Sequence, residues 1–202
     1  HIGQFRTKRF EDIPNSIKEQ SNISADNAIK EAIGETSEEV RRTFVTVNGS
    51  MIHDIYGLRV LLGNPTRVVS TEIWEGAVNI VLEYPEGYRG VATWVDLPDA
   101  WDFEETLEVY GSSKRVMVSY TTGFQKAVSP IKIVEVDKNG MTFRKEPALS
   151  WENPFRRELR QFHDSIVDNK IPRASVQSAR DDISLVIDII RSNIENRSIQ
   201  IN

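Results

Sequence analysis

The stretch LLGNPTRVVSTEIWEGAVNIVLEY, residues 61–84, decides the fold because the spacing of its apolar residues changes within it. Before Gly63 the apolar residues recur every three or four positions, which is the period of a helix. Gly63, Asn64 and Pro65 end that helix. After Pro65 the residues are β-branched and then alternate strictly, so that one strand face carries Val78, Ile80, Leu82 and Tyr84. The chain is therefore predicted to pass here from helix to sheet.

Upstream of this stretch the pattern predicts helices. Thr36, with Glu39 three residues later, is typical of a capping box and predicts one long helix that continues to residue 62. Two short surface helices are predicted within residues 13–34, with Ser24 as an N-cap and Gly34 as a C-cap.

Downstream, the sequence predicts a meander of strands and then two more helices. The strands are expected at residues 67–73, 77–84, 88–96, 103–110, 115–120, 131–136 and 141–143. Helices are expected to begin at Pro154 and after Ser175. Helices, then strands, then helices predict an α+β fold: an open, mostly antiparallel sheet of about six to seven strands with helices packed on one face.

Composition predicts an ordinary globular chain. The 202 residues, 39% of them hydrophobic and 27% charged, are expected to form a single domain over residues 1–202. A net charge of -5 opposes binding to nucleic acid or to an anionic membrane. Because there is no cysteine, no signal peptide and no long apolar run, we expect a cytoplasmic location. The start at His1 predicts that the chain is part of a longer protein.

Three tryptophans, Trp74, Trp94 and Trp101, fall within or beside the expected sheet. They form either an interaction surface on its open face or part of the core beneath the helices.

Several kinds of site are excluded by motif. The sequence contains no G-x-G-x-x-G or P-loop for a nucleotide, no H-E-x-x-H for zinc and no G-x-S-x-G nucleophile elbow. A metal site is not expected, since the three histidines are far apart in sequence. Adjacent carboxylates such as Asp181 and Asp182 should diverge, so we predict that they lie on the solvated surface.

The most informative side chain is His53. In the long helix it would lie opposite Met51 and Ile55, with Gly49, Ser50, Tyr56 and Gly57 as neighbours. Glycines cost about 1 kcal/mol each inside a helix, so their presence suggests that the imidazole borders a space for a ligand. In the alternative interpretation, the glycines let another element pack closely and His53 donates to a carbonyl.

The run HDIYGLRVLLGNP, residues 53–65, resembles the H-D-x-D-x-x-R-x-L-x-G-x-P stretch of the glucose-fructose oxidoreductase / inositol dehydrogenase (Gfo/Idh/MocA) family. NPFRREL at 153–159 and SARDD at 178–182 are similar to the closing helices of that family, and FRTKRF at 5–10 to its first strand after the nucleotide domain.

The resemblance implies a C-terminal domain that binds substrate and pairs subunits through its sheet. NAD or NADP would be bound mainly by an N-terminal Rossmann domain that is absent from this chain. His53 matches the family's acid/base histidine, but Gly49 stands at the aspartate position and Tyr56 at the second aspartate of H-D-x-D. The chain therefore retains the histidine of the family's catalytic pattern and lacks its aspartates at positions 49 and 56.

Two hypotheses follow. In the first, the chain is the substrate-binding and oligomerisation domain of an NAD(P)-dependent oxidoreductase acting on a sugar- or cyclitol-like polyol. His53 is its acid/base, Ser50 and Tyr56 bind substrate, and Lys8 and Arg9 are further substrate contacts. In the second, the chain is a non-catalytic binding or dimerisation module related to that family. A homo-oligomer formed through the open sheet face is expected, and in the second hypothesis that face binds either another partner or a second copy of the chain.

Overall fold

The computed structural model describes residues 14–17, 26–97, 99, 103–121 and 129–201. The chain divides into two compact units, residues 1–101 with 176–202, and residues 102–175. In the described part of the chain, no helix combines the length and the apolar character needed to cross a membrane.

The first unit contains an antiparallel sheet with the strand order β3-β2-β1-β8. Its strands are β1 (Arg67–Trp74), β2 (Ala77–Glu83), β3 (Arg89–Val95) and β8 (Ile199–Gln200). A short 3-10 turn, η1 (Pro85–Gly87), joins β2 to β3. The first three strands confirm the prediction, whereas β8 was not predicted because two residues are too few to show a period.

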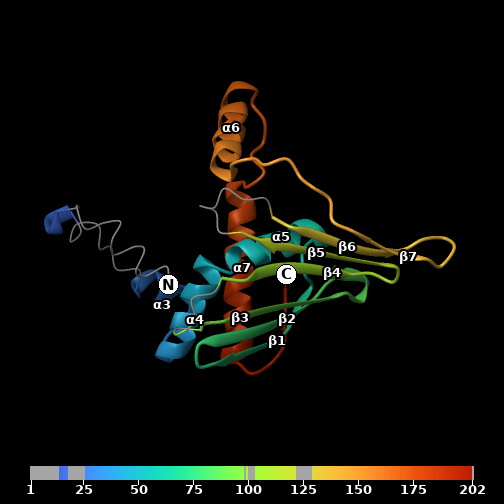
Figure 1. Ribbon diagram of the computed structural model, residues 1–202. Helices are drawn as coiled ribbons and strands as arrows, with labels where there is room; N and C mark the ends of the chain where they lie inside the picture. The colour runs from blue at the N-terminus through green and yellow to red at the C-terminus, as the bar shows by residue number, and fades with distance from the viewer. Residues whose placement is uncertain (1–13, 18–25, 98, 100–102, 122–128, 202) are drawn as a thin grey trace. The chain divides into compact units, whose positions relative to one another are not determined.

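One face of this sheet forms the core of the first unit. The alternation predicted along β2 is confirmed, because four successive even-numbered side chains are no more than 1% exposed: Val78, Ile80, Leu82 and Tyr84. The helix α7 (Val176–Ile194) contributes Leu185, Val186, Ile189 and Ile190 to the same core. It crosses the strands in the view of Figure 1 and packs chiefly on β1.

From residue 26 to the sheet, the described chain forms three helices: α3 (Asp26–Ile33), α4 (Glu38–Gly49) and α5 (Ile52–Leu62). The prediction of one long helix is wrong, because the helix breaks at Ser50 and Met51. The poor helix formers Asn48 and Gly49 directly precede this break. The cap is Ser37 rather than Thr36, since the Ser37 hydroxyl accepts a hydrogen bond from the Val40 amide at 3.3 Å.

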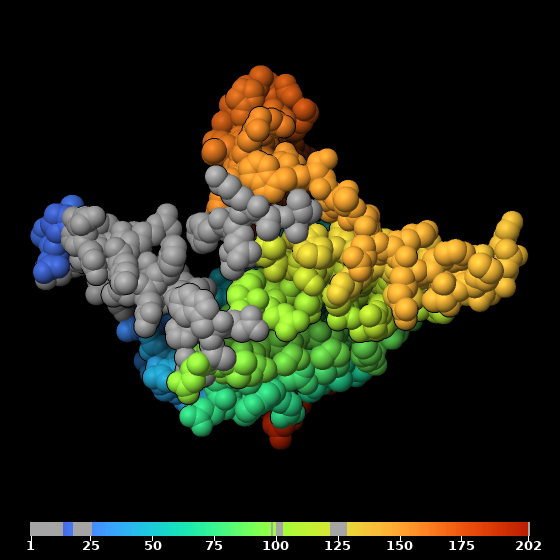
Figure 2. Space-filling model, viewed as in Figure 1, coloured from blue at the N-terminus to red at the C-terminus, as the bar shows by residue number. Residues whose placement is uncertain are grey.

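The second unit contains β4 (Glu105–Tyr110), β5 (Lys114–Tyr120), β6 (Ile131–Val136) and β7 (Thr142–Lys145), in that order in an antiparallel sheet. Its helix α6 (Pro154–Val167) begins as predicted, with the Asn153 side chain accepting from the Arg156 amide. None of the described residues of this unit is fully buried. Atoms of β4–β7 form part of the surface visible in Figure 2.

The antiparallel α+β architecture is confirmed, but the strands form two four-stranded sheets where the sequence predicted one. Among the described strands, β3 pairs only with β2, and β4 pairs only with β5. Alternation within a strand reports which side chains share a face, and it carries no information about which strands become neighbours.

Candidate functional site

The helix α5 presents His53 to solvent and anchors its opposite side in the core. Met51, Ile55 and Leu58 are buried, at the i, i+4 and i+7 spacing of one helix face. His53 is exposed in the first turn, as the sequence predicted. On the same side, three and seven positions later, lie Tyr56 and Val60.

The side chain of Asp54 is the charged neighbour of His53. It is half-buried, and this burial raises the pKa of the Asp54 carboxyl above its usual range. The positive charge of His53 and a backbone hydrogen bond act in the opposite direction. An exposed imidazole beside a half-buried carboxyl provides two groups that can hold a proton at the start of one helix.

The other proposed site residues are only partly brought together. Tyr56 lies on the His53 side of α5 and is half-buried. Ser50 lies outside that helix, at the C-cap of α4, where its amide donates to the Thr46 carbonyl at 2.8 Å. Within the described part of the chain, neither residue is hydrogen-bonded to His53. Lys8 and Arg9 lie outside the described residues.

Gly49, one of the two glycines near His53, was predicted to lie inside a helix and to make room for a ligand. Gly49 is the last residue of α4 rather than a residue inside a long helix. An added Cβ at Gly49 would meet no atom within 4 Å, so no close packing requires a glycine there. Its position at the break between α4 and α5 accounts for the residue without a ligand.

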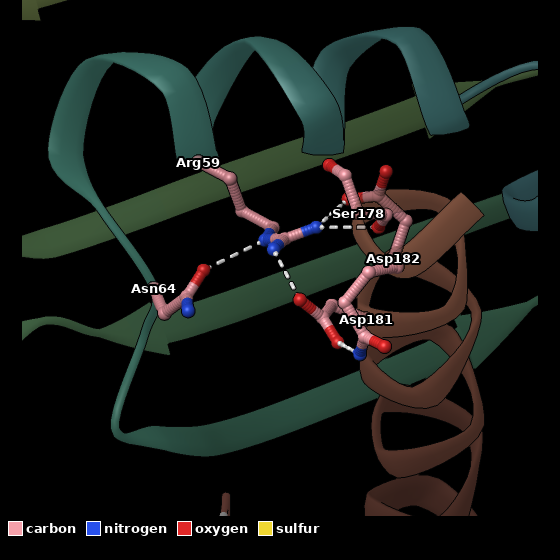
Figure 3. Close-up of polar contacts among 6 residues, drawn as sticks. Arg59, Asn64, Ser178, Asp181 and Asp182 are labelled. Atoms are coloured by element: carbon pink, nitrogen blue, oxygen red, sulfur yellow. Dashed lines mark hydrogen bonds and ion pairs between the residues drawn. The ribbon is translucent and has the colours of Figure 1, made fainter. Parts of the chain in front are cut away.

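A polar cluster around Arg59 links the C-terminal half of α5 to α7 and to the turn before β1. The sequence pattern did not predict this cluster. The Arg59 Nε donates to Asn64 Oδ1 at 2.9 Å, and Nη1 donates to the Ser178 carbonyl at 3.2 Å. The same guanidinium forms ion pairs with Asp182 and, at 3.4 Å from Nη2, with Asp181 (Figure 3). The side chain of Arg59 is only 11% exposed.

The prediction of a solvated Asp181–Asp182 pair is wrong for Asp182, whose side chain is 8% exposed. Adjacent carboxylates diverge from a helix, but one guanidinium has nitrogens on two edges and can bind both. Asp181 is more exposed and also accepts from Gln177 Nε2 at 2.8 Å. No local signal in the sequence indicated this buried ion pair, because Arg59 is followed by the exposed Val60 and its two aspartate partners lie 122 and 123 positions away.

Tyr84 is another residue of the first unit whose polar group is buried. It is 1% exposed, and its hydroxyl has no hydrogen-bond partner among the residues that the structure describes. Burial raises the pKa of Tyr84 to about 12, although the positive charge of Arg59 lowers it. The neutral phenol is therefore the form present near neutral pH.

The two described tryptophans of the expected sheet, Trp74 and Trp94, do not share one open face. Trp74 is 48% exposed, whereas Trp94 is half-buried and pairs with Val78 on the helix-covered side of the sheet. Both line a cavity of about 800 Å³ between α4 and the turn after β1, together with Arg41 and Val45. Trp101 lies outside the described residues.

Sites for a metal ion and for a dinucleotide each have specific structural requirements. Among the described residues, no group of three or more His, Asp or Glu side chains is placed to hold a metal ion. Dinucleotides bind at the carboxyl ends of parallel strands, beside a glycine-rich loop. All strand pairs described in this chain are antiparallel, and the sequence has no such loop. The described residues therefore do not fit NAD or NADP.

The fold of helices and antiparallel sheets is shared with solved structures of proteins described as oxidoreductases or dehydrogenases. A candidate NADPH-dependent oxidoreductase from Desulfitobacterium hafniense is similar over 76% of this chain, with a TM-score of 0.65 and 16% identity. Aldose-aldose oxidoreductase from Caulobacter crescentus, solved with glycerol, covers 74% with a TM-score of 0.59 and 18% identity. UDP-N-acetylglucosamine 3-dehydrogenase from Acidithiobacillus ferrooxidans covers 71%, with a TM-score of 0.55 and 10% identity.

The chain spans about half the length of these solved proteins: 47%, 45% and 45% respectively. No family model and no curated protein sequence matches it. At these identities the likeness establishes the fold that the chain shares with them.

Proposed function

We propose that this chain is the substrate-binding and oligomerisation part of an NAD(P)-dependent oxidoreductase that acts on a sugar- or cyclitol-like polyol. The observation that carries the proposal is the shared fold, together with an exposed imidazole at the start of α5. Two of the similar proteins are described as acting on an aldose and on a nucleotide sugar.

In this proposal, His53 exchanges a proton with the hydroxyl or carbonyl oxygen of the substrate. Its exposed ring leaves a nitrogen accessible to a ligand, and the Asp54 carboxyl is the charged neighbour of that ring. Tyr56 and Ser50 would contribute hydrogen bonds to substrate hydroxyls. NAD or NADP would be bound mainly by a domain outside this chain, because the described residues include no parallel strands beside a glycine-rich loop.

The test uses the full-length protein that contains this chain, with NAD or NADP and a panel of polyols and sugars. Replacement His53→Ala is expected to lower kcat by about 10²–10⁴-fold, the range for loss of a general acid/base. The matched control is His163→Ala, since His163 is an exposed histidine on α6. Turnover that is unchanged by His53→Ala would reject the catalytic role.

The second candidate function is a non-catalytic module that binds a second copy of the chain. The strand register places two rows of aliphatic side chains on one face of the β4–β7 sheet. These rows are Leu107, Val118 and Ile131, and Val109, Val116 and Ile133. All six are partly exposed, and an apolar sheet face of this kind favours association with another protein surface.

Light scattering of wild type and of Val118→Lys tests this candidate. Because Val118 lies in the middle of its row, a lysine there is expected to convert an oligomer to a monomer. Lys132→Ala is the control, since Lys132 is an exposed residue that pairs with Met117 on the opposite face. A monomer in wild type would reject this surface as the oligomer interface.

A further inference from the structure

We infer that Arg59 is a positioning residue that fixes the orientation of α5 and thereby of His53. This inference rests on the proposed role of His53 and deepens it. Arg59 itself does not belong to the exposed face. It follows His53 by six positions, about 600° of helical rotation, and so lies about 120° away around the helix.

Arg59 joins three segments that meet at the end of α5. Its Nε bonds Asn64 in the turn toward β1, while Nη1 bonds the Ser178 carbonyl in the first turn of α7. The ion pairs with Asp181 and Asp182 add further contacts to α7 (Figure 3). A planar guanidinium presents donors in several fixed directions, whereas a lysine ammonium is a single point on a flexible stem.

The remaining contacts of α5 do not define its rotation as sharply. Its N-cap position, Met51, makes no capping hydrogen bond through its side chain. The buried side chains Met51, Ile55 and Leu58 hold the helix on the core by apolar contact, which is not directional. The directional contacts of Arg59 therefore set the angle at which the exposed face of α5 meets solvent.

Because the Arg59–Asp182 ion pair is more buried than the Arg59–Asp181 pair, its loss should destabilise the protein more. The Asp182 side chain is 8% exposed, whereas that of Asp181 is 42% exposed and has Gln177 as a second partner. Loss of the Asp182 charge leaves a nearly buried guanidinium with a weaker partner. The two adjacent aspartates therefore form a matched pair for experiment.

The experiment measures amide hydrogen exchange in α5 and the NMR pH titration of the His53 ring in the full chain. With Arg59→Lys or Asp182→Asn, we expect exchange in α5 to rise on the order of tenfold while exchange in β2 stays low. The His53 titration should shift in the same variants. With Asp181→Asn both should change little, and His163 serves as an internal reference that does not move.

Asn64→Ala provides a milder variant in case Asp182→Asn fails to fold, because Asn64 is exposed and supplies only the bond to Nε. It should produce the same changes to a smaller degree. If stability falls uniformly while α5 exchange and the His53 titration stay as in wild type, Arg59 is only a structural ion-pair residue and the inference is wrong. Neither readout requires turnover, so a failure of the catalytic proposal would be seen separately, in the His53→Ala assay.

Discussion

Tyr84 illustrates how a single polar atom affects the core of the first unit. Its ring is buried beside Gly90, while its buried hydroxyl has no hydrogen-bond partner in the described part of the chain. A buried hydroxyl that makes no hydrogen bond loses its contact with water and gains nothing in return. Replacement Tyr84→Phe is therefore expected to retain stability or to increase it by about 1 kcal/mol. Urea denaturation measures the difference, and a loss of more than about 2 kcal/mol would show that the hydroxyl has a favourable partner.

The same residue gives a prediction at alkaline pH. Burial raises the pKa of Tyr84 to about 12 from 10.0, so the folded state holds the phenolic proton more tightly than the unfolded chain does. The resulting stability is fully present below about pH 10 and is lost as the pH rises toward 12. In a spectrophotometric titration, Tyr84→Phe should remove the last tyrosine to ionise. A last phase that persists in the variant would contradict this assignment.

Asp54 gives the corresponding prediction at acid pH. Its folded-state pKa is raised by burial, so the folded protein binds the proton more tightly than the unfolded chain does. The stability of the protonated form is present below the usual value of 3.8 and is lost as the pH rises through the folded pKa. Asp54→Asn should therefore be more stable than wild type at neutral pH, with a difference that vanishes on acidification. Denaturation curves across pH test this, with the exposed Asp96→Asn as a control.

At the residue scale, the sequence predicted what local spacing determines. The exposure of His53 followed from its place in the helical period. The partner of Arg59 could not be predicted, because Asp182 is 123 positions away and only the folded chain brings them together. The orphan hydroxyl of Tyr84 likewise depends on which side chains surround it.

At the scale of elements, two glycines differ in whether the surrounding structure leaves room for a side chain. A Cβ added at Gly90 in β3 would lie 2.9 Å from Tyr84 Cε2, inside the buried core, whereas one added at Gly49 would meet nothing within 4 Å. Gly90→Ala is expected to destabilise the fold by about 1–3 kcal/mol through overpacking. Gly49→Ala should be neutral or stabilising by up to about 1 kcal/mol. Thermal denaturation of both variants tests this, and equal effects would contradict it.

Strands were predicted more accurately than helix boundaries, for a physical reason. The alternation in β2 requires only that one face be buried, and each side chain reports its own face. The segment 38–62, predicted as one helix, has apolar residues at helical spacing on both sides of residue 50. The spacing therefore does not reveal the break between α4 and α5. The weak helix formers at Asn48 and Gly49 were the local signal for it.

At the scale of the whole molecule, the antiparallel α+β fold was predictable and the division into two sheets was not. The order of helices and strands along the chain favours an antiparallel sheet with helices. Which strands pair depends on contacts between segments distant in sequence, such as β1 with β8. Whether the two units fold as one domain, as the chain length suggests, stays a prediction.

The two units should differ in their protection from hydrogen exchange. The first unit has a core of fully buried side chains from β2 and α7, whereas no described residue of the second unit is fully buried. Amide protection at low protein concentration should therefore be higher in β1–β3 than in β4–β6. If the aliphatic rows of β4–β6 are covered by a second copy, their protection should also rise with concentration, while that of β1–β3 should not. Exchange measured by mass spectrometry over about a hundredfold range of concentration tests both statements. Concentration-independent protection of β4–β6, equal to that of β1–β3, would mean that this sheet is stabilised within the single chain.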